Sequence, residues 1–213
     1  MVKLQSQDDL NAALERLVAR DPRLAHYVVS CQPIPLRQRQ SGLSGLLQII
    51  LAQQVSVASA RAIWQKFETR FPECDPAELA QVGEEGLRTC SLSRPKIKTV
   101  QSIAQSMLDG FDLNALGERN AGHVKKALIG LHGVGPWTAD VYLLFCLGEG
   151  DIFPAGDLAL QVAVAHVSKM DVRPKEKALA ALAQNLWAPE RSAAAHLFWA
   201  IYRDLKSGRD GVI

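Results

Sequence analysis

The sequence predicts an all-α protein, and three observations lead to this fold class. Apolar residues recur at helical spacing along most of the 213 residues, whereas no segment alternates apolar and polar residues as a half-exposed strand does. Proline and glycine separate the helical segments, and capping residues stand at several helix starts. With 48% apolar residues, the chain is long enough to bury a core in one domain or two small ones.

Capping residues and prolines indicate where the helices begin. Ser6 and Asp75 have side chains that accept N–H groups at a helix start. Pro22, Pro76 and Pro136 suit the first helical turn, because proline lacks an N–H that would need a partner there. The predicted helices are 6–17, 21–30, 43–53, 57–67, a short one after Asp75, 94–108, 123–129, 136–147, 157–167, 174–187 and 189–205. We expect disorder at the two ends and in residues 32–40.

The most informative segment is residues 128–140, LIGLHGVGPWTAD. Gly130 and Gly133 end one amphipathic helix in a sharp turn, where positive φ is favoured, and a proline begins the next helix. Backbone N–H groups near Gly133, Val134 and Gly135 then point away from a helix N-terminus, and such groups attract phosphate. An ordinary αα-hairpin also uses glycine, so the turn alone fits both interpretations.

One carboxylate, Asp157, follows this hairpin in the sequence FPAGDL. A carboxylate there can cap the helix that begins at that point, or it can stabilise positive charge that develops on a sugar as a glycosidic bond breaks. The residues alone favour the cap. Asp151 and Asp140 are weaker candidates, and Asp140, inside the second helix of the hairpin, is predicted to be a surface charge.

Composition limits the possible partners. The net charge of +2 is weak support for a nucleic-acid partner, so any phosphate contact must come from a local patch. The candidate cations, each of which taken singly is more typical of a solvated surface, are Arg94, Lys96, Lys98, Lys125 and Lys126. No apolar run reaches 18 residues and the N-terminus lacks an apolar signal core, so we expect no membrane partner.

The four cysteines are scattered and contain no C-x-x-C pair, which predicts neither a zinc site nor a disulfide framework. Reduced thiols of this kind indicate a cytoplasmic protein, associated with the nucleoid in a bacterium or located in the nucleus of a eukaryote.

Several motifs in order resemble the helix–hairpin–helix DNA glycosylases, and among them the 3-methyladenine DNA glycosylase II branch. The matching stretches are 50–57 (ILAQQVSV), 92–96 (LSRPK), 131–139, 153–157 and 187–199. The resemblance implies two helical subdomains that flank a DNA-binding cleft, without the N-terminal β domain of larger members. One subdomain is 40–150 with the hairpin, and the other is 1–39 plus 151–213 with the catalytic Asp157.

The resemblance also assigns a base pocket. Trp137 stands where bifunctional members carry a Schiff-base lysine, which implies a monofunctional enzyme with water as the nucleophile. Trp137 and Trp199 align with aromatic walls of the pocket, where a cationic alkylated purine would gain ~2 kcal/mol by stacking. Trp199 can equally be a packing residue, and Trp64 and Trp187 are predicted to lie in the core. Val141 departs from the tyrosine of the better-known members, which leaves the base preference open.

Base flipping needs a residue that fills the gap in the duplex. Gln54 matches that intercalating position, in the turn of residues 53–56, and Gln53 is the second candidate; the alternative for both is a buried structural role. By resemblance, Lys96 and the amides of Gly133, Val134 and Gly135 contact DNA phosphate, and backbone carbonyls hold a monovalent cation when DNA is bound. Those carbonyls belong to Ile129, Leu131 and Val134. No cysteine follows Cys146, so the iron–sulfur cluster of another branch is not expected.

The resemblance implies a monomeric enzyme that hydrolytically excises alkylated purines, such as 3-methyladenine or 7-methylguanine, from double-stranded DNA and leaves an abasic site. Two other classes stay open from the residues. A non-enzymatic helix–hairpin–helix module would bind DNA without a catalytic acid, and an unrelated helical scaffold could contain such a hairpin by chance.

Overall fold

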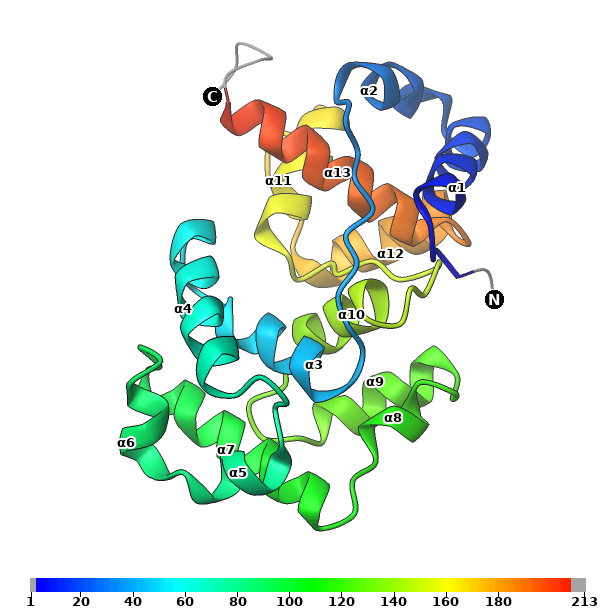
Figure 1. Cartoon of the computed structure of the whole chain (residues 1–213). Helices are drawn as coiled ribbons and strands as arrows, with labels where there is room; N and C mark the ends of the chain where they lie inside the picture. The colour runs from blue at the N-terminus through cyan, green and yellow to red at the C-terminus, as the bar shows by residue number, and fades with distance from the viewer. Residues whose placement is uncertain (1–2, 208–213) are drawn as a thin grey trace. The chain divides into compact units, whose positions relative to one another are not determined.

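In the computed structural model, which describes residues 3–207, the chain is helical and contains no strand in that range beyond one isolated bridge between Lys3 and Glu149 (Figure 1). The predicted all-α fold class is confirmed. The helices are α1 (Gln7–Arg20), the 3-10 helix η1 (Pro22–Leu24), α2 (Ala25–Ser30), α3 (Gly42–Leu51), α4 (Val57–Arg70), α5 (Pro76–Gln81), α6 (Gly83–Arg88), α7 (Arg94–Leu108), α8 (Leu113–Leu116), α9 (Ala121–Ile129), α10 (Pro136–Phe145), α11 (Leu158–Val167), α12 (Glu176–Trp187) and α13 (Arg191–Lys206). Within the described range, no helix combines the length and apolar character needed to cross a membrane.

The helices group into two compact units. The acid unit, which contains Asp157, comprises the residues up to 38 together with those from 147 on. The hairpin unit, which contains the glycine-rich turn, comprises residues 39–146. The DNA-binding cleft expected from the resemblance stays a prediction.

The acid unit is built around α13. Residues 192–201 of this helix are all buried, as expected of a helix that is covered by neighbours on nearly every side. α1, α2, α11 and α12 pack against it (Figure 1). A cluster of three aromatic rings forms the core beside it: Trp187 lies 4.7 Å from Phe198 and 5.2 Å from Phe153 between ring centroids.

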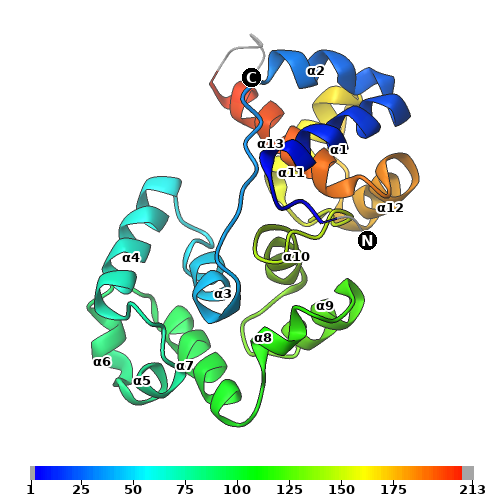
Figure 2. The same ribbon diagram turned by 45° about the vertical axis from the view of Figure 1, so that its right-hand side comes forward.

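In the hairpin unit, α9 and α10 are neighbours joined by the glycine-rich turn, and α10 packs on α3 (Figure 2). α3 also contacts α4, α7 and α8, and α5 lies against α7. The buried Tyr142 on α10 accepts a hydrogen bond from the Gly42 N–H at 2.9 Å, which joins the start of α3 to α10. The second helix of the hairpin is therefore part of the core of this unit.

The strongly periodic segments were the easiest to predict, and α7 has the predicted bounds. The predicted helix 21–30 is instead divided into η1 and α2. The short helices α6 and α8 were missed, because four to six residues carry too little periodicity. The prediction of disorder is wrong for residues 32–40, where Ile34 is buried in an extended segment. At the ends, the disorder prediction falls mainly on residues 1–2 and 208–213, which lie outside the described residues.

Candidate functional site

The loop that leads to Asp157 is held by the N-terminal part of α13. Arg191 forms a bidentate ion pair with Asp151, with N–O distances of 2.6 and 2.9 Å. The buried Ser192 hydroxyl bonds to backbone groups of Glu149 and Ile152. Farther along this loop, Phe153 is buried in the aromatic cluster of the core. A loop fixed at so many points can present its next side chain in one defined position.

Asp157 is the N-cap of α11. Its Oδ1 accepts hydrogen bonds from the N–H groups of Ala159 at 2.9 Å and Leu160 at 3.1 Å, and the side chain is half-buried. Its own N–H donates to the Pro154 carbonyl at 2.8 Å. The capping role considered from the sequence is thus present, and it fixes the orientation of the carboxylate. A cap and a catalytic role do not exclude each other.

Trp199 lies buried on α13 in the same unit, between two cationic or ionisable neighbours. The Arg37 guanidinium lies over the indole, 5.1 Å from the ring centroid. The His196 ring meets it edge-on at 6.1 Å. Burial lowers the pKa of His196 to about 4, so its imidazole is neutral at neutral pH. Sequence reasoning found Trp199 but missed Arg37.

In the hairpin unit, the turn between α9 and α10 depends on one glycine. Gly133 has a φ of +78°, and a Cβ at this position would clash with the Thr99 hydroxyl on α7. Gly130 has an ordinary φ of −67°, so the prediction of positive φ there is wrong. Gly135, the N-cap of α10, has a φ of −92° and open space where a Cβ would point. A side chain at Gly135 would therefore not strain the turn.

Some backbone N–H groups of the turn are hydrogen-bonded within the protein, and others are available to a ligand. The Val134 N–H, predicted to contact phosphate, donates to the Leu131 carbonyl at 3.2 Å within the turn, and both side chains are buried. The N–H groups of Gly133 and Gly135 have no hydrogen-bond acceptor within residues 3–207. These two amides at the start of α10 are the donors that a bound anion could use.

Two of the candidate charges form an ion pair inside the hairpin. Asp140 on α10 is buried and lies 2.6 Å from the Lys125 ammonium on α9. The prediction that Asp140 is a surface charge is therefore wrong. Lys126 and Lys98 are exposed, as a phosphate ligand must be. Arg94 pairs with Glu84 at 3.1 Å on the surface.

The turn after α3, which contains both candidate intercalating residues, is fixed from two sides. The Gln53 side chain donates to the Thr138 hydroxyl on α10 at 2.7 Å, as in the structural alternative. Gln54 is exposed and has a φ of +57°. The Lys96 ammonium on α7 donates to the carbonyls of Leu51 at 2.8 Å and Gln53 at 2.9 Å. Burial lowers the pKa of Lys96. The phosphate contact of Lys96 stays a prediction, and its observed partners are backbone carbonyls.

The remaining tryptophans divide as follows. Trp137 is half-buried in the first turn of α10, two residues after Gly135. Trp187 lies in the core as predicted, and Trp64 is half-buried and stacked on Phe67 at 5.7 Å. Of the aromatic and acidic candidates, Asp157 and Trp199 therefore belong to the acid unit, and Trp137 belongs to the hairpin unit.

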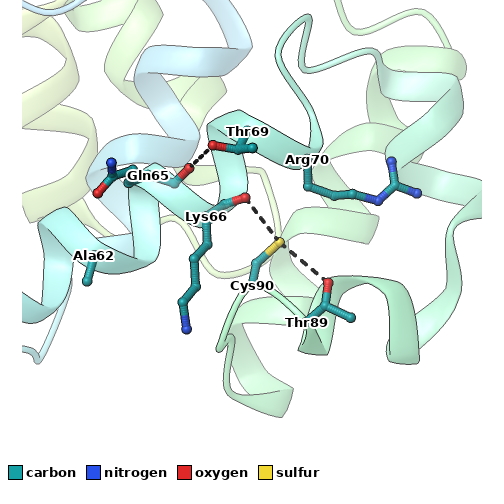
Figure 3. A pocket seen from close by; sticks show the side chains of 7 residues that line it. All are labelled: Ala62, Gln65, Lys66, Thr69, Arg70, Thr89 and Cys90. Carbon is teal, nitrogen blue, oxygen red and sulfur yellow. Dashed lines mark hydrogen bonds between the residues drawn. The ribbon is translucent and has the colours of Figure 1, made fainter.

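A separate pocket of about 550 Å³ lies beside α4 in the hairpin unit (Figure 3). It is lined by Ala62, Gln65, Lys66, Thr69, Arg70, Thr89 and Cys90. Its cations are already engaged, because Lys66 donates to Ser91 at 2.8 Å and Arg70 pairs with Glu78 at 3.0 Å. The Cys90 thiol is buried and points to the Lys66 carbonyl. None of the predicted site residues lines this pocket.

An exposed glycine turn between two helices, followed in the chain by an aspartate on a firmly held loop, is the arrangement expected of a helix–hairpin–helix DNA repair protein. The chain belongs to the HhH-GPD superfamily of base excision DNA repair proteins, whose family model matches residues 47–189. Both the hairpin and Asp157 lie within that match, and the superfamily and branch predicted from the sequence are confirmed.

One similar sequence and two similar solved structures illustrate the relationship. DNA-3-methyladenine glycosylase 1 of Schizosaccharomyces pombe is 27% identical over 184 residues, which are 83% of this chain and 79% of that protein. The structure of DNA-3-methyladenine glycosidase from Bacillus halodurans has a TM-score of 0.77 at 24% identity and covers 97% of this chain and 94% of its own. The S. pombe enzyme Mag1 in complex with abasic DNA has a TM-score of 0.75 at 23% identity, with 92% and 96% covered. At these identities the two structures establish the shared fold.

Proposed function

We propose that this protein is a monofunctional DNA glycosylase that hydrolyses the bond between deoxyribose and an alkylated purine in double-stranded DNA. The observation that carries the proposal is that Asp157 follows the hairpin within the family match and is held by α11 in one orientation. The names of the relatives, DNA-3-methyladenine glycosylases, support alkylated purines as the substrate class.

Asp157 acts on the sugar. As the C1′–N bond breaks, the electron pair leaves with the base, and C1′ takes on the positive charge of an oxocarbenium ion. A carboxylate with a fixed orientation stabilises that charge and directs a water molecule, which adds its oxygen to C1′ and releases a proton. The products are the free base and an abasic site. An alkylated purine that is already cationic is a good leaving group and needs no separate acid.

Trp137 makes the enzyme monofunctional. An indole cannot form the Schiff base through which a lysine would attack C1′ and cleave the strand. We expect borohydride to trap no covalent complex between the protein and DNA, and the abasic product to stay uncleaved until alkali is added. Denaturing electrophoresis of the reaction measures both. A trapped complex would show that another amine attacks the sugar.

The hairpin unit holds the DNA. The N–H groups of Gly133 and Gly135 donate to one phosphate, and exposed Gln54 enters the gap that the flipped nucleotide leaves. A monovalent cation would suit the carbonyls of Ile129, Leu131 and Val134, because carbonyl oxygen is a preferred ligand of such ions. The Leu131 oxygen accepts one N–H and has a second lone pair. Such a cation would add positive charge next to the phosphate.

Release of free base tests the proposal. Duplex DNA treated with a methylating agent is incubated with the protein, and the supernatant is separated by chromatography. We expect free methylated purines in amounts that grow with time. Binding of the duplex at low salt without release would instead identify a helix–hairpin–helix binding module. No binding at low salt would contradict both.

A further inference from the structure

The face of Trp199 already carries a positive charge. The Arg37 guanidinium lies 5.1 Å from the centroid of the indole, a distance typical of a cation–π interaction. Both residues belong to the acid unit, so this contact does not depend on the other unit. Arg37 comes from the extended segment after α2, whereas Trp199 is on α13.

His196 holds this pair in place. Its Nδ1 lies 2.8 Å from the Ser192 carbonyl, and its Nε2 lies 3.3 Å from the Arg37 N–H. A carbonyl accepts and an N–H donates, so the ring is the neutral tautomer with its proton on Nδ1. The same ring packs edge-on against Trp199. One buried side chain therefore positions the backbone of Arg37 and one edge of the indole.

We propose that Arg37 is a specificity-determining residue that disfavours cationic bases at Trp199 relative to neutral ones. This inference rests on the proposed function and on the base-pocket role that the resemblance implies for Trp199, in which a flipped base stacks on the indole. Within that function it predicts a shift in preference at this tryptophan: lesions whose base is uncharged at neutral pH, such as 1,N6-ethenoadenine, gain relative to cationic ones such as 7-methylguanine.

The sign of the effect is the same on either face of the indole. A base on the face that Arg37 covers must displace the guanidinium, whose backbone stays bonded to His196, so the displaced positive charge remains near the ring and repels a cationic base. A base on the opposite face stacks on a ring whose electrons are already polarised toward Arg37, and two positive charges repel each other across the ring. A neutral purine stacks mainly through dispersion, and although it too must displace the guanidinium on the covered face, it meets no charge repulsion on either face.

The structure therefore changes the expectation for this tryptophan. From the sequence, Trp199 was expected to select cationic alkylated purines, because an electron-rich ring attracts a cation. With Arg37 on the indole, that attraction is largely taken up within the protein. The position of one arginine thus decides which charge state of the base the indole favours.

The experiment compares two lesions in one protein. Two duplexes of the same sequence contain either 7-methylguanine or 1,N6-ethenoadenine at one position, and single-turnover excision rates are measured for wild type and Arg37→Met. We expect the rate ratio of 7-methylguanine to ethenoadenine to rise about tenfold in Arg37→Met. Arg37→Lys, which keeps the charge, should leave the ratio near that of wild type.

The ratio of the two excision rates within one variant does not depend on the fraction of folded protein or on the affinity for DNA. Arg173→Met, which removes an exposed charge from the same unit, serves as the control and should not change the ratio. An unchanged ratio in Arg37→Met refutes the inference alone. Equal slowing of both reactions with a weaker salt dependence of binding would show a phosphate contact instead. A wild type that releases neither base refutes the proposed function, and the inference with it.

Discussion

The two units of this protein offer their functional groups in different ways. In the acid unit the groups are side chains: the Asp157 carboxylate on its capped helix, and the Trp199 indole between Arg37 and His196. In the hairpin unit the functional groups belong mainly to the backbone. They are the amides of the glycine turn and the loop after α3, whose carbonyls accept hydrogen bonds from Lys96. The first arrangement suits chemistry on a base and sugar, and the second suits contact with a repeating phosphate backbone.

The difference determines how each unit can be tested. A side chain can be replaced by one of equal shape that lacks the charge, which leaves the fold intact. A backbone amide cannot be removed in this way, and it can only be obstructed by a side chain added next to it. The structure shows where each change is tolerated, since an asparagine can replace the cap at Asp157 and a Cβ fits at Gly135.

The largest effect is expected for Asp157→Asn. Asparagine caps a helix about as well as aspartate, so α11 should keep its start while the negative charge is lost. We expect base release to fall by about 100-fold or more. Affinity for a duplex with an abasic analogue should stay within about twofold, because phosphate contacts supply most of it. Asp171→Asn, at an exposed position of the same unit, is the control. Near-normal release would remove Asp157 from the mechanism.

Gly135→Asp should show the opposite pattern. The added carboxylate finds open space and no backbone strain, but it lies where a DNA phosphate would approach the start of α10. We expect binding at moderate salt to weaken about tenfold or more, since one phosphate contact is lost and a like charge is added. Saturating protein at low salt should partly restore release. Gly135→Ala separates bulk from charge, and wild-type binding by Gly135→Asp would make the hairpin merely structural.

Stability should depend on pH in opposite directions in the two units. In the acid unit, His196 has its pKa lowered to about 4 by burial, so the unfolded chain binds a proton that the folded one does not, and stability falls as the pH drops from about 6.5 toward 4. In the hairpin unit, burial raises the pKa values of Tyr142 and Cys146 to about 12, so stability falls as the pH rises above about 9. Each proton contributes about 1.4 kcal/mol per pH unit.

Hydrogen exchange measured on peptides from each unit checks this prediction. Between pH 7 and pH 5, protection corrected for the intrinsic rate should fall in peptides of α13 and stay constant in those of α10. His196→Gln should reduce the fall in α13. Equal losses in both units at pH 5 would show that groups other than His196 control acid stability.

The sequence predicted the parts of the site that depend on local order. The turn at Gly133 and the cap at Asp157 follow from residues a few positions apart, and both are present. The contacts that sequence reasoning missed join distant segments, as Arg37 joins Trp199. Asp140 was misjudged for the same reason: its charge is tolerated inside the unit because Lys125 on the neighbouring helix pairs with it.

Lys96 combines the two kinds of functional group, because its side chain donates hydrogen bonds to backbone carbonyls. Its ammonium donates to the carbonyls of Leu51 and Gln53 at the end of α3, directly before Gln54. A cation at the end of a helix satisfies carbonyls that have no helical partner, and here it also fixes the turn that presents Gln54. The sequence predicted instead that Lys96 contacts a phosphate. The two roles predict different effects of Lys96 on the salt dependence of DNA binding.

Lys96→Met removes the charge and keeps the length of the side chain. If Lys96 positions the turn, single-turnover release should slow by a few-fold while the salt dependence of DNA binding stays that of wild type, since no phosphate contact is lost. Loss of a phosphate contact would instead lower the slope of log affinity against log salt concentration by about 0.9. Arg119→Met, at an exposed position of the same unit and outside the candidate cations, controls for the loss of a positive charge. A lower slope with an unchanged rate of release would return Lys96 to the phosphate contact, and the hairpin unit would then also use a side chain to bind DNA.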